Sequence, residues 1–216
     1  ILIVSDGIPG HFNQSNGVAL LLSNKHSLNK RIIDLQFKSH LLRGFITVFS
    51  RFMMRLPGPL TAKITSLLYK KIDTRGFDLI IAAGGKTAPY TAALRILNKI
   101  PVIQLGSPRG LHSSLFNALV TVERYHEDSS NIIASITPSL YSPEVCDQAA
   151  KEKGLSDHLL FLIGGEGIGY SYKEAEWKDL INSIKQIYKT TNLPITVVTS
   201  RRSDPEVEKK IQSELQ

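Results

Sequence analysis

The chain has 216 residues, which at about 150 residues per domain corresponds to one large domain or two small ones. Its hydrophobic fraction of 42% and charged fraction of 21% are typical of a globular protein and exclude a disordered chain. The formal net charge of +7 favours an anionic partner, such as phosphate, nucleic acid or an acidic membrane surface. The single cysteine, Cys146, excludes a disulfide scaffold and a thiolate metal cluster, and it suits a reducing compartment.

From the given sequence we expect neither a membrane span nor a signal peptide. No run approaches the roughly 18 consecutive apolar residues that a span needs. The opening Ile1-Leu2-Ile3-Val4 has no basic region of the kind that begins a signal peptide. The missing methionine and the uncapped helical pattern at 211–216 predict that the chain is part of a longer one.

Short β-branched apolar runs alternate with helical patterns along nearly the whole chain. We expect strands at residues 1–5, 31–35, 78–82, 102–105, 118–122, 132–134, 159–163 and 195–199. We expect helices at about 14–23, 40–55, 59–71, 87–97, 143–153, 173–190 and 205–215. This alternation predicts an α/β fold in which parallel sheets are covered by helices.

A turn-rich connector at 137–143 predicts a domain boundary near 136–158, because a fresh strand and helix pattern starts at Leu159. We expect a Rossmann-like domain over 1–155 and the start of a second over 156–216. About 60 residues are too few to complete a doubly wound sheet. The sequence therefore predicts two facing Rossmann-like domains, the second incomplete.

In open parallel sheets, ligands bind beyond the carboxyl ends of the strands, so the loops after the strands matter most. The first runs from Asp6 through Gly10, His11 and Asn13 to Gln14. Its glycines allow close approach of a ligand, and the following helix start attracts anions. His11 could act as a general base oriented by Asp6. In the alternative reading, Asp6 and Asn13 are turn and cap residues and His11 is merely exposed.

The second loop, Gly84-Gly85-Lys86-Thr87, resembles a Walker A loop only superficially. That motif needs a glycine at position 80, where the sequence has Ile80. What remains is a Gly-Gly turn with Thr87 capping a helix and Lys86 near an anion-attracting helix start. The turn is either structural or a substrate contact.

The third loop places Arg109 between a proline and a glycine. There it can offer a bidentate guanidinium to a phosphate or carboxylate, although a plain surface arginine is an equal alternative.

Two further loops follow the last two expected strands. Gly164-Gly165-Glu166 does not match G-x-G-x-x-G, because the glycines fall at 164, 165, 167 and 169. Ser200-Arg201-Arg202 opens the last helix, with Pro205 at its first position and Asp204 or Ser203 as cap. Two such loops at adjacent strand ends would form a cradle for a diphosphate.

Other chemistries find little support in the sequence. It contains no H-E-x-x-H or G-x-S-x-G motif and no aromatic pattern for RNA stacking. His126-Glu127-Asp128 could bind a metal, but three adjacent polar residues usually form a solvated loop. We expect no metal site, and no nucleic acid as a partner, since that reading rests only on the net charge.

The segment from Lys25 to Lys71 holds ten lysines and arginines and one acid, Asp34. Within it, positions 43, 47, 51 and 55 form a narrow polar stripe beside a wide apolar, phenylalanine-rich face. This pattern is typical of a helix that lies in an anionic membrane interface, and we expect residues 40–71 to make that contact. The alternative is a helix that faces the core and points its arginines to water.

Taken in order, the loops resemble the signature segments of the mitochondrial-fission "elongated mitochondria" (ELM) family. The segments are Asp6-Gly-Ile-Pro-Gly-His-Phe-Asn-Gln-Ser15, Ile80-Ile-Ala-Ala-Gly-Gly-Lys-Thr-Ala-Pro89, Gln104-Leu-Gly-Ser-Pro-Arg109, Leu162-Ile-Gly-Gly165 and Thr199-Ser-Arg-Arg202. The likeness to this family, and to its bacterial members, spans nearly the whole chain. The family is similar in architecture to GT-B glycosyltransferases, whose first domain takes the acceptor and meets the membrane.

The resemblance implies a transferase that moves a sugar from a nucleotide-sugar to a cell-envelope acceptor, without metal or cofactor. It implies that Asp6, Gly10 and His11 lie on the acceptor side. It places Gly164, Gly165, Ser200, Arg201 and Arg202 near the donor diphosphate. The expected location is the cytoplasm, peripheral on the inner face of the cytoplasmic membrane. The rival implication is a non-catalytic membrane-surface adaptor that recruits a protein partner of unknown identity.

Overall fold

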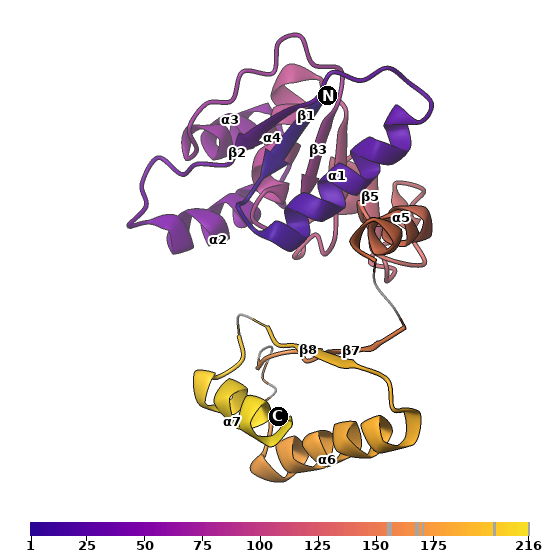
Figure 1. The fold of residues 1–216 in the computed structure, drawn as a ribbon. Helices are drawn as coiled ribbons and strands as arrows, with labels where there is room; N and C mark the ends of the chain where they lie inside the picture. The colour runs from indigo at the N-terminus through magenta and orange to yellow at the C-terminus, as the bar shows by residue number, and fades with distance from the viewer. Residues whose placement is uncertain (155–156, 167–168, 170, 201, 216) are drawn as a thin grey trace. The chain divides into compact units, whose positions relative to one another are not determined.

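The computed structural model describes residues 1–154, 157–166, 169, 171–200 and 202–215 (Figure 1). The chain divides into two compact units, Ile1–Cys146 and Asp147–Gln216. Each unit is described by itself below.

The first unit is built on a six-stranded parallel sheet with the order β2-β1-β3-β4-β5-β6. Its strands are β1 (Leu2–Ser5), β2 (Arg31–Asp34), β3 (Ile80–Ala83), β4 (Val102–Leu105), β5 (Ala118–Thr121) and β6 (Asn131–Ile133). Strands β1 and β3 are buried along their whole length. Their continuous apolar sequences are what a parallel strand covered on both faces requires.

Helices cover both faces of this sheet (Figure 1). Helix α1 (Pro9–Ser23) packs on the face that carries Ile3, Ile81 and Leu105. Helices α2 (Arg43–Met54), α3 (Pro59–Leu67) and α4 (Ala88–Asn98) form the larger core on the opposite face, with Leu2 and Ile80. A short 3₁₀ helix, Ser113–Leu115, lies between β4 and β5, and α5 (Pro143–Lys153) follows β6.

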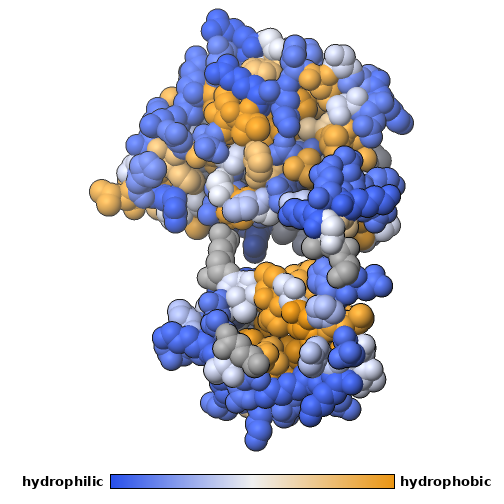
Figure 2. Space-filling model, viewed as in Figure 1, coloured by the Kyte–Doolittle hydropathy of each residue, from blue (hydrophilic) through white to orange (hydrophobic). Residues whose placement is uncertain are grey.

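The second unit contains one parallel strand pair, β7 (Leu159–Leu162) and β8 (Ile195–Val198). Helix α6 (Glu174–Thr191) connects the two strands, and α7 (Pro205–Leu215) follows β8. The helices pack on one face of the pair around Trp177, Ile184 and Ile211. Leu162 and Val198 are exposed, and Figure 2 shows apolar side chains gathered over the strands.

The expected α/β fold with a parallel sheet is confirmed for the first unit, and every expected strand is present within two residues of its predicted ends. Three helix bounds were wrong. Helix α1 starts at Pro9 instead of 14, since a proline is well placed in a first helical turn. Helix α2 starts at Arg43, and α3 ends at Leu67. The chain after α3 forms an antiparallel bridge between Tyr69 and Phe37.

Candidate functional site

The carboxyl ends of β1 and β3 form the point where the sheet changes its direction of winding. The helix that follows β1 packs on one face of the sheet, and the helix that follows β3 packs on the other. The chain therefore leaves these two neighbouring strands toward opposite faces of the sheet. Such a switch point is the usual ligand site of an open α/β sheet.

His11 and Asp6 lie together at this switch point. The Nδ1 atom of His11 lies 2.9 Å from Oδ2 and 3.1 Å from Oδ1 of Asp6. The Asp6 side chain is 2% exposed and also accepts a hydrogen bond from the backbone N–H of Ile8, whereas the His11 side chain is 31% exposed. Because an ionised carboxylate can only accept, this contact assigns the proton to Nδ1 and leaves Nε2 as an acceptor. The expected pairing of the two residues is confirmed.

The imidazole of His11 lies against the backbone of Gly84. A Cβ atom at Gly84 would stand 2.3 Å from Cε1 and Nδ1 of the ring, and the φ angle there is +86°. Both the space and the backbone conformation therefore require glycine. The carbonyl oxygen of Gly84 accepts from Nε2 of Gln104 at 3.1 Å, which fixes the turn under the ring.

Thr87 lies beneath this turn at the N-cap position of α4, as expected, but its side chain makes no capping hydrogen bond. Its side chain is buried, and its hydroxyl donates to the carbonyl oxygens of Ala83 and Gly84 at 3.0 and 2.8 Å. The threonine thus holds the Gly84-Gly85 turn from the inside. Lys86 lies half-buried at the surface of the same turn.

Three arginines gather beside the turn. A Cβ atom at Gly85 would stand 2.4 Å from Cγ of Arg109, so the arginine lies across that glycine. Arg51 of α2 donates from Nη2 to the carbonyl oxygen of Gly85 at 3.2 Å. Nη2 of Arg55 lies 2.8 Å from where a Cβ atom at Gly110 would be. Burial, and then the charge of Arg109, lower the pKa of the Arg51 guanidinium.

The sequence did not predict that Arg51 and Arg55 would lie at this site. Their spacing of four predicted one stripe on an interfacial helix, but the two side chains reach the loops after β3 and β4. The signal was present in the glycines at 85 and 110, each of which leaves room for a guanidinium. A single sequence does not show which arginine fills which space.

The remaining residues expected in the first loop lie on α1. Gly10 and His11 are in its first turn, where backbone N–H groups have no acceptor within the helix. Asn13 is half-buried one turn further on. Gln14 lines a small hollow of about 70 Å³ with Gly106 and Thr137, away from the His11 ring.

In the second unit, the loops after β7 and β8 meet. A Cβ atom at Gly165 would stand 2.4 Å from the carbonyl carbon of Arg202 and 2.5 Å from Oγ of Ser200. Gly164 is exposed at the end of the same strand. Glu166 is exposed and accepts from the hydroxyl of Ser171 at 2.7 Å.

The loop after β8 is ordered by its own polar groups. The hydroxyl of Ser200 accepts from the backbone N–H of Arg202 at 3.1 Å. The expected cap of α7 is confirmed, because Asp204 accepts from the backbone N–H of Glu206 at 2.9 Å. Arg201, also expected here, lies outside the described residues.

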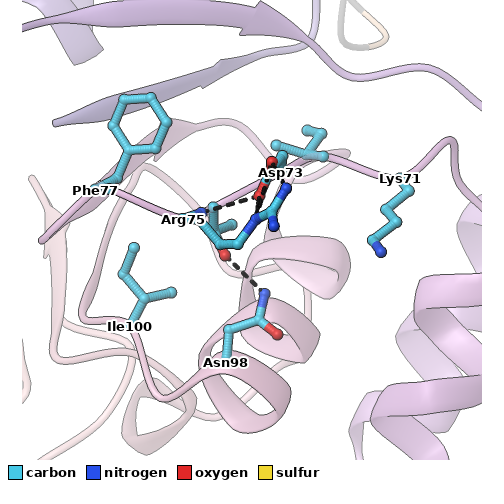
Figure 3. A pocket seen from close by; sticks show the side chains of 9 residues that line it. Lys71, Asp73, Arg75, Phe77, Asn98 and Ile100 are labelled. Atoms are coloured by element: carbon cyan, nitrogen blue, oxygen red, sulfur yellow. Dashed lines mark hydrogen bonds and ion pairs between the residues drawn. The ribbon is translucent and has the colours of Figure 1, made fainter.

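A wider hollow of about 850 Å³ lies at the opposite edge of the first sheet, before β3 and β4 (Figure 3). Most of its polar side chains are bonded to one another. Arg75 pairs with Asp73 at 2.7 Å and lowers the pKa of that carboxyl, and Asn98 donates to Thr74 at 2.9 Å. Neither His11 nor the three arginines line this hollow, so the carboxyl edge remains the candidate site.

The side chains of residues 126–128 have separate partners. His126 Nε2 lies 3.2 Å from the carbonyl oxygen of Leu111, and Glu127 pairs with Arg124 at 3.3 Å. Asp128 accepts from the hydroxyls of Ser113 and Ser130, which lower its pKa to about 2. Among the described residues, no group of three or more histidine, cysteine or acidic side chains could hold a metal ion.

Within the part of the chain that the structure describes, no helix has both the length and the apolar character needed to cross a membrane.

Comparison with known proteins identifies the family. The sequence model of a family described as Mitochondrial fission ELM1 matches residues 9–216. No curated protein matches the chain. The matched range begins in the first turn of α1 and includes His11, the Gly84-Gly85 turn, the three arginines and the loops of the second unit. The chain therefore belongs to the mitochondrial fission ELM1 family.

Proposed function

We propose that this protein is a GT-B-type glycosyltransferase that moves a sugar from a nucleotide-sugar to a cell-envelope acceptor, either lipid-linked or a lipopolysaccharide. The observation that carries the proposal is the His11–Asp6 pair, held on Gly84 at the switch point of a parallel sheet. The ring is partly exposed at this switch point, and in its neutral form the hydrogen bond from Nδ1 to Asp6 leaves Nε2 as an acceptor. A general base for an acceptor hydroxyl needs this arrangement.

In the proposed reaction, Nε2 of His11 takes the proton of an acceptor hydroxyl as its oxygen attacks the anomeric carbon of the sugar. The bond from that carbon to the diphosphate oxygen breaks, and the nucleoside diphosphate leaves with the electron pair. Asp6 stabilises the imidazolium that forms, because its buried carboxylate accepts the Nδ1 hydrogen bond throughout. The step requires neither a metal nor a cofactor.

The donor diphosphate would be held by the loops after β7 and β8. Gly164 and Gly165 allow close approach, while Ser200 and Arg202 supply a hydroxyl and a cation. The N-terminus of α7 lies directly after this loop and favours negative charge. Both the contact between the loops and the helix start support the assignment.

The test of donor binding is a thermal-shift panel of the full-length protein with UDP-, GDP-, CMP- and ADP-sugars and with the free nucleotides. A ligand at 100 times its dissociation constant adds about 2.7 kcal/mol to the free energy of unfolding, which moves the midpoint by a few degrees. We expect one nucleotide class to give this shift, and Arg202→Gln to abolish it. A flat panel would contradict the transferase proposal.

The test of catalysis is the turnover of the full-length protein with the donor found in that panel. We expect His11→Ala to lower turnover by about 10²-fold or more, the usual contribution of a general base. His26→Ala is the control, because His26 is exposed in the loop after α1. Unchanged turnover in His11→Ala would remove the catalytic role of His11.

The second candidate function is a membrane-surface adaptor, and the outer face of α2 favours it. Phe45, Val48 and Phe52 follow one another at helical spacing and are 62%, 66% and 56% exposed. Leu41, Leu42, Leu56 and Leu60 extend this apolar area on both sides of the helix. Monomeric proteins rarely expose a large continuous apolar patch unless it binds something.

The adaptor predicts binding to vesicles that contain an anionic lipid, together with a flat nucleotide-sugar panel. Phe45→Ser with Phe52→Ser should then weaken vesicle binding at least tenfold, since each buried aromatic side chain contributes about 1.5–3 kcal/mol. Leu97→Ser is the control, because Leu97 is an exposed apolar residue on α4. Equal vesicle binding by the double variant and the wild type would remove this candidate.

A further inference from the structure

Three guanidinium groups from two separate segments converge on the glycines that follow β3 and β4. Arg51 and Arg55 come from α2, one helical turn apart, and Arg109 comes from the loop after β4. Arg51 bonds to the carbonyl oxygen of Gly85, across which Arg109 lies. Arg55 reaches Gly110, the residue after Arg109 in the chain.

The positive charge of this cluster is not balanced by the protein around it. None of the three guanidinium groups has an ion pair with a carboxylate among the described residues. The Nε atom of Arg51 is buried and has no hydrogen-bond acceptor within the same described set. Like charges repel, and a buried donor without an acceptor is destabilising, so a bound anion would stabilise this arrangement.

The geometry around the cluster suits a phosphoryl group. Planar guanidinium groups bind tetrahedral phosphate oxygens with paired N–H donors, and several are needed to balance a dianion. Gly85 and Gly110 carry no side chains that would separate the arginines. The backbone is left-handed at Arg109 and Gly110, with φ of 52° and 82°, so the loop turns sharply at the residue that joins the cluster.

The cluster also lies next to the proposed base. His11 packs on Gly84, and the aliphatic part of the Arg109 side chain packs on Gly85, so the two side chains rest on successive residues of one turn. A phosphoryl group held by the arginines would therefore lie at the same turn that carries the His11 ring.

We propose that Arg51, Arg55 and Arg109 form a subsite for a phosphoryl group of the acceptor, beside His11. This inference rests on the proposed transferase, and it names the acceptor as a phosphorylated molecule. The same subsite would accept a free phosphate ester or the phosphate headgroup of a lipid. Arg51 and Arg55 then bind a ligand at the switch point and do not form part of a membrane-binding stripe.

The direct test is phosphate binding by the full-length protein, measured by titration calorimetry with inorganic phosphate and with pyrophosphate. Ionic strength is held constant with sodium chloride, because exposed charges are screened by salt. We expect Arg51→Gln and Arg109→Gln each to weaken binding about tenfold or more, since each removes charge-assisted hydrogen bonds. Arg43→Gln is the matched control, because it removes one exposed positive charge from the same helix, and it should leave the affinity unchanged.

A second variant separates the contribution of the paired guanidinium N–H donors from that of the positive charge. Arg51→Lys keeps the cation but loses the planar pair of donors, so we expect its affinity to fall between those of the wild type and Arg51→Gln. Circular dichroism on each variant shows whether it is folded. Phosphate binding that is equal in the wild type, Arg51→Gln and Arg109→Gln would overturn the proposal.

The source of the phosphoryl group is decided by a vesicle arm. Phosphatidylcholine vesicles with phosphatidic acid are compared with vesicles of the same charge made with phosphatidylserine. A preference for phosphatidic acid that is lost in Arg109→Gln supports a lipid phosphate, whereas phosphate binding in solution without that preference supports a soluble acceptor.

Failure of the subsite and failure of the transferase proposal give different results. If the arginine cluster binds no phosphate, the nucleotide-sugar shift and its loss in Arg202→Gln still stand. If the nucleotide-sugar panel is flat, phosphate binding that depends on Arg51 and Arg109 still stands as a property of the first unit. Arg202→Gln is expected to leave that binding unchanged.

Discussion

The guanidinium of Arg51 donates to the carbonyl oxygen of Gly85 at 3.2 Å, across 34 positions of sequence. This bond connects α2 to the turn that carries the His11 ring on its preceding residue, Gly84. The candidate site is therefore assembled from four separate segments of the first unit, namely the loop from β1 into α1, the inner side of α2, the turn after β3 and the loop after β4.

The first prediction concerns the tautomer of His11. In Asp6→Asn the side-chain amide can donate to Nδ1, so the proton moves to Nε2 and the base is lost. We expect the ¹⁵N NMR signals of the ring to exchange their protonated and unprotonated assignments, and turnover to fall by about 10²-fold or more. Ring signals that are unchanged in Asp6→Asn would show that Asp6 does not set the tautomer.

The second prediction concerns Gly84→Ala. The new methyl group would occupy the position of the imidazole, and alanine would be strained at a φ of +86°. We expect a loss of about 1–3 kcal/mol in the free energy of unfolding, measured in urea, together with a displaced His11 ring signal. Gly44→Ala is the control, because nothing lies within 4 Å of its Cβ position in α2, and there alanine should stabilise by about 0.5–1 kcal/mol. Equal stability of the two variants would contradict the packing described here.

The third prediction concerns Gly17, in the buried interior of α1. Alanine usually stabilises a helix relative to glycine, but a Cβ atom at Gly17 would stand 2.6 Å from the backbone nitrogen of Ser139. The segment that contains Ser139 would have to move. We expect Gly17→Ala to lower the free energy of unfolding by about 1–3 kcal/mol in urea denaturation. Stabilisation instead would mean that the segment after β6 does not lie on α1.

The fourth prediction concerns acid stability. Hydrogen bonds from Ser113 and Ser130 hold the pKa of Asp128 at about 2, below its ordinary value near 3.9. A carboxyl whose pKa is lowered by folding stabilises the protein above the unfolded pKa, and that contribution disappears as the pH falls from about 4 to about 2. We expect Asp128→Asn to flatten the fall in unfolding midpoint over this range.

Ser113→Ala removes the largest cause of the lowered pKa of Asp128, so it should reproduce part of this flattening. Glu127→Gln is the control for a change of charge, because Glu127 is 87% exposed in an ion pair with Arg124. An acid profile of Asp128→Asn that matches the wild type would contradict the assignment.

The sequence predicts the sheet well because each strand can be recognised from a few consecutive residues. All are short runs dominated by apolar residues, most of them containing β-branched side chains, and the glycines after β3 and β7 mark the strand ends. Helix starts were harder to predict. Pro9 was interpreted as part of a loop, although a proline in the first turn and an Asp6 side chain bonded to the Ile8 N–H together begin α1.

The candidate site likewise has one part that the local sequence predicts and one part that depends on packing. Asp6 and His11 are five residues apart, so local reasoning could pair them. The arginine cluster depends on how α2 packs against the sheet, and that packing is decided by buried residues such as Ile46 and Met54. Arg51 and Arg55 also occupy a helix with an apolar outer face, which favoured a different interpretation. Thr87 was expected to cap α4, but the carbonyl groups of its own turn compete for its hydroxyl.

Helix α2 carries exposed aromatic side chains on one side and the guanidinium groups of the site on another. At 12 residues it is about 18 Å long. Whatever binds its outer side and shifts it must change the reach of Arg51 toward Gly85. Thermodynamic reciprocity then requires that an anion held by the arginines alter the affinity of the outer side by the same factor. Through this helix, binding of a surface by the outer side and binding of an anion by the arginines would influence one another.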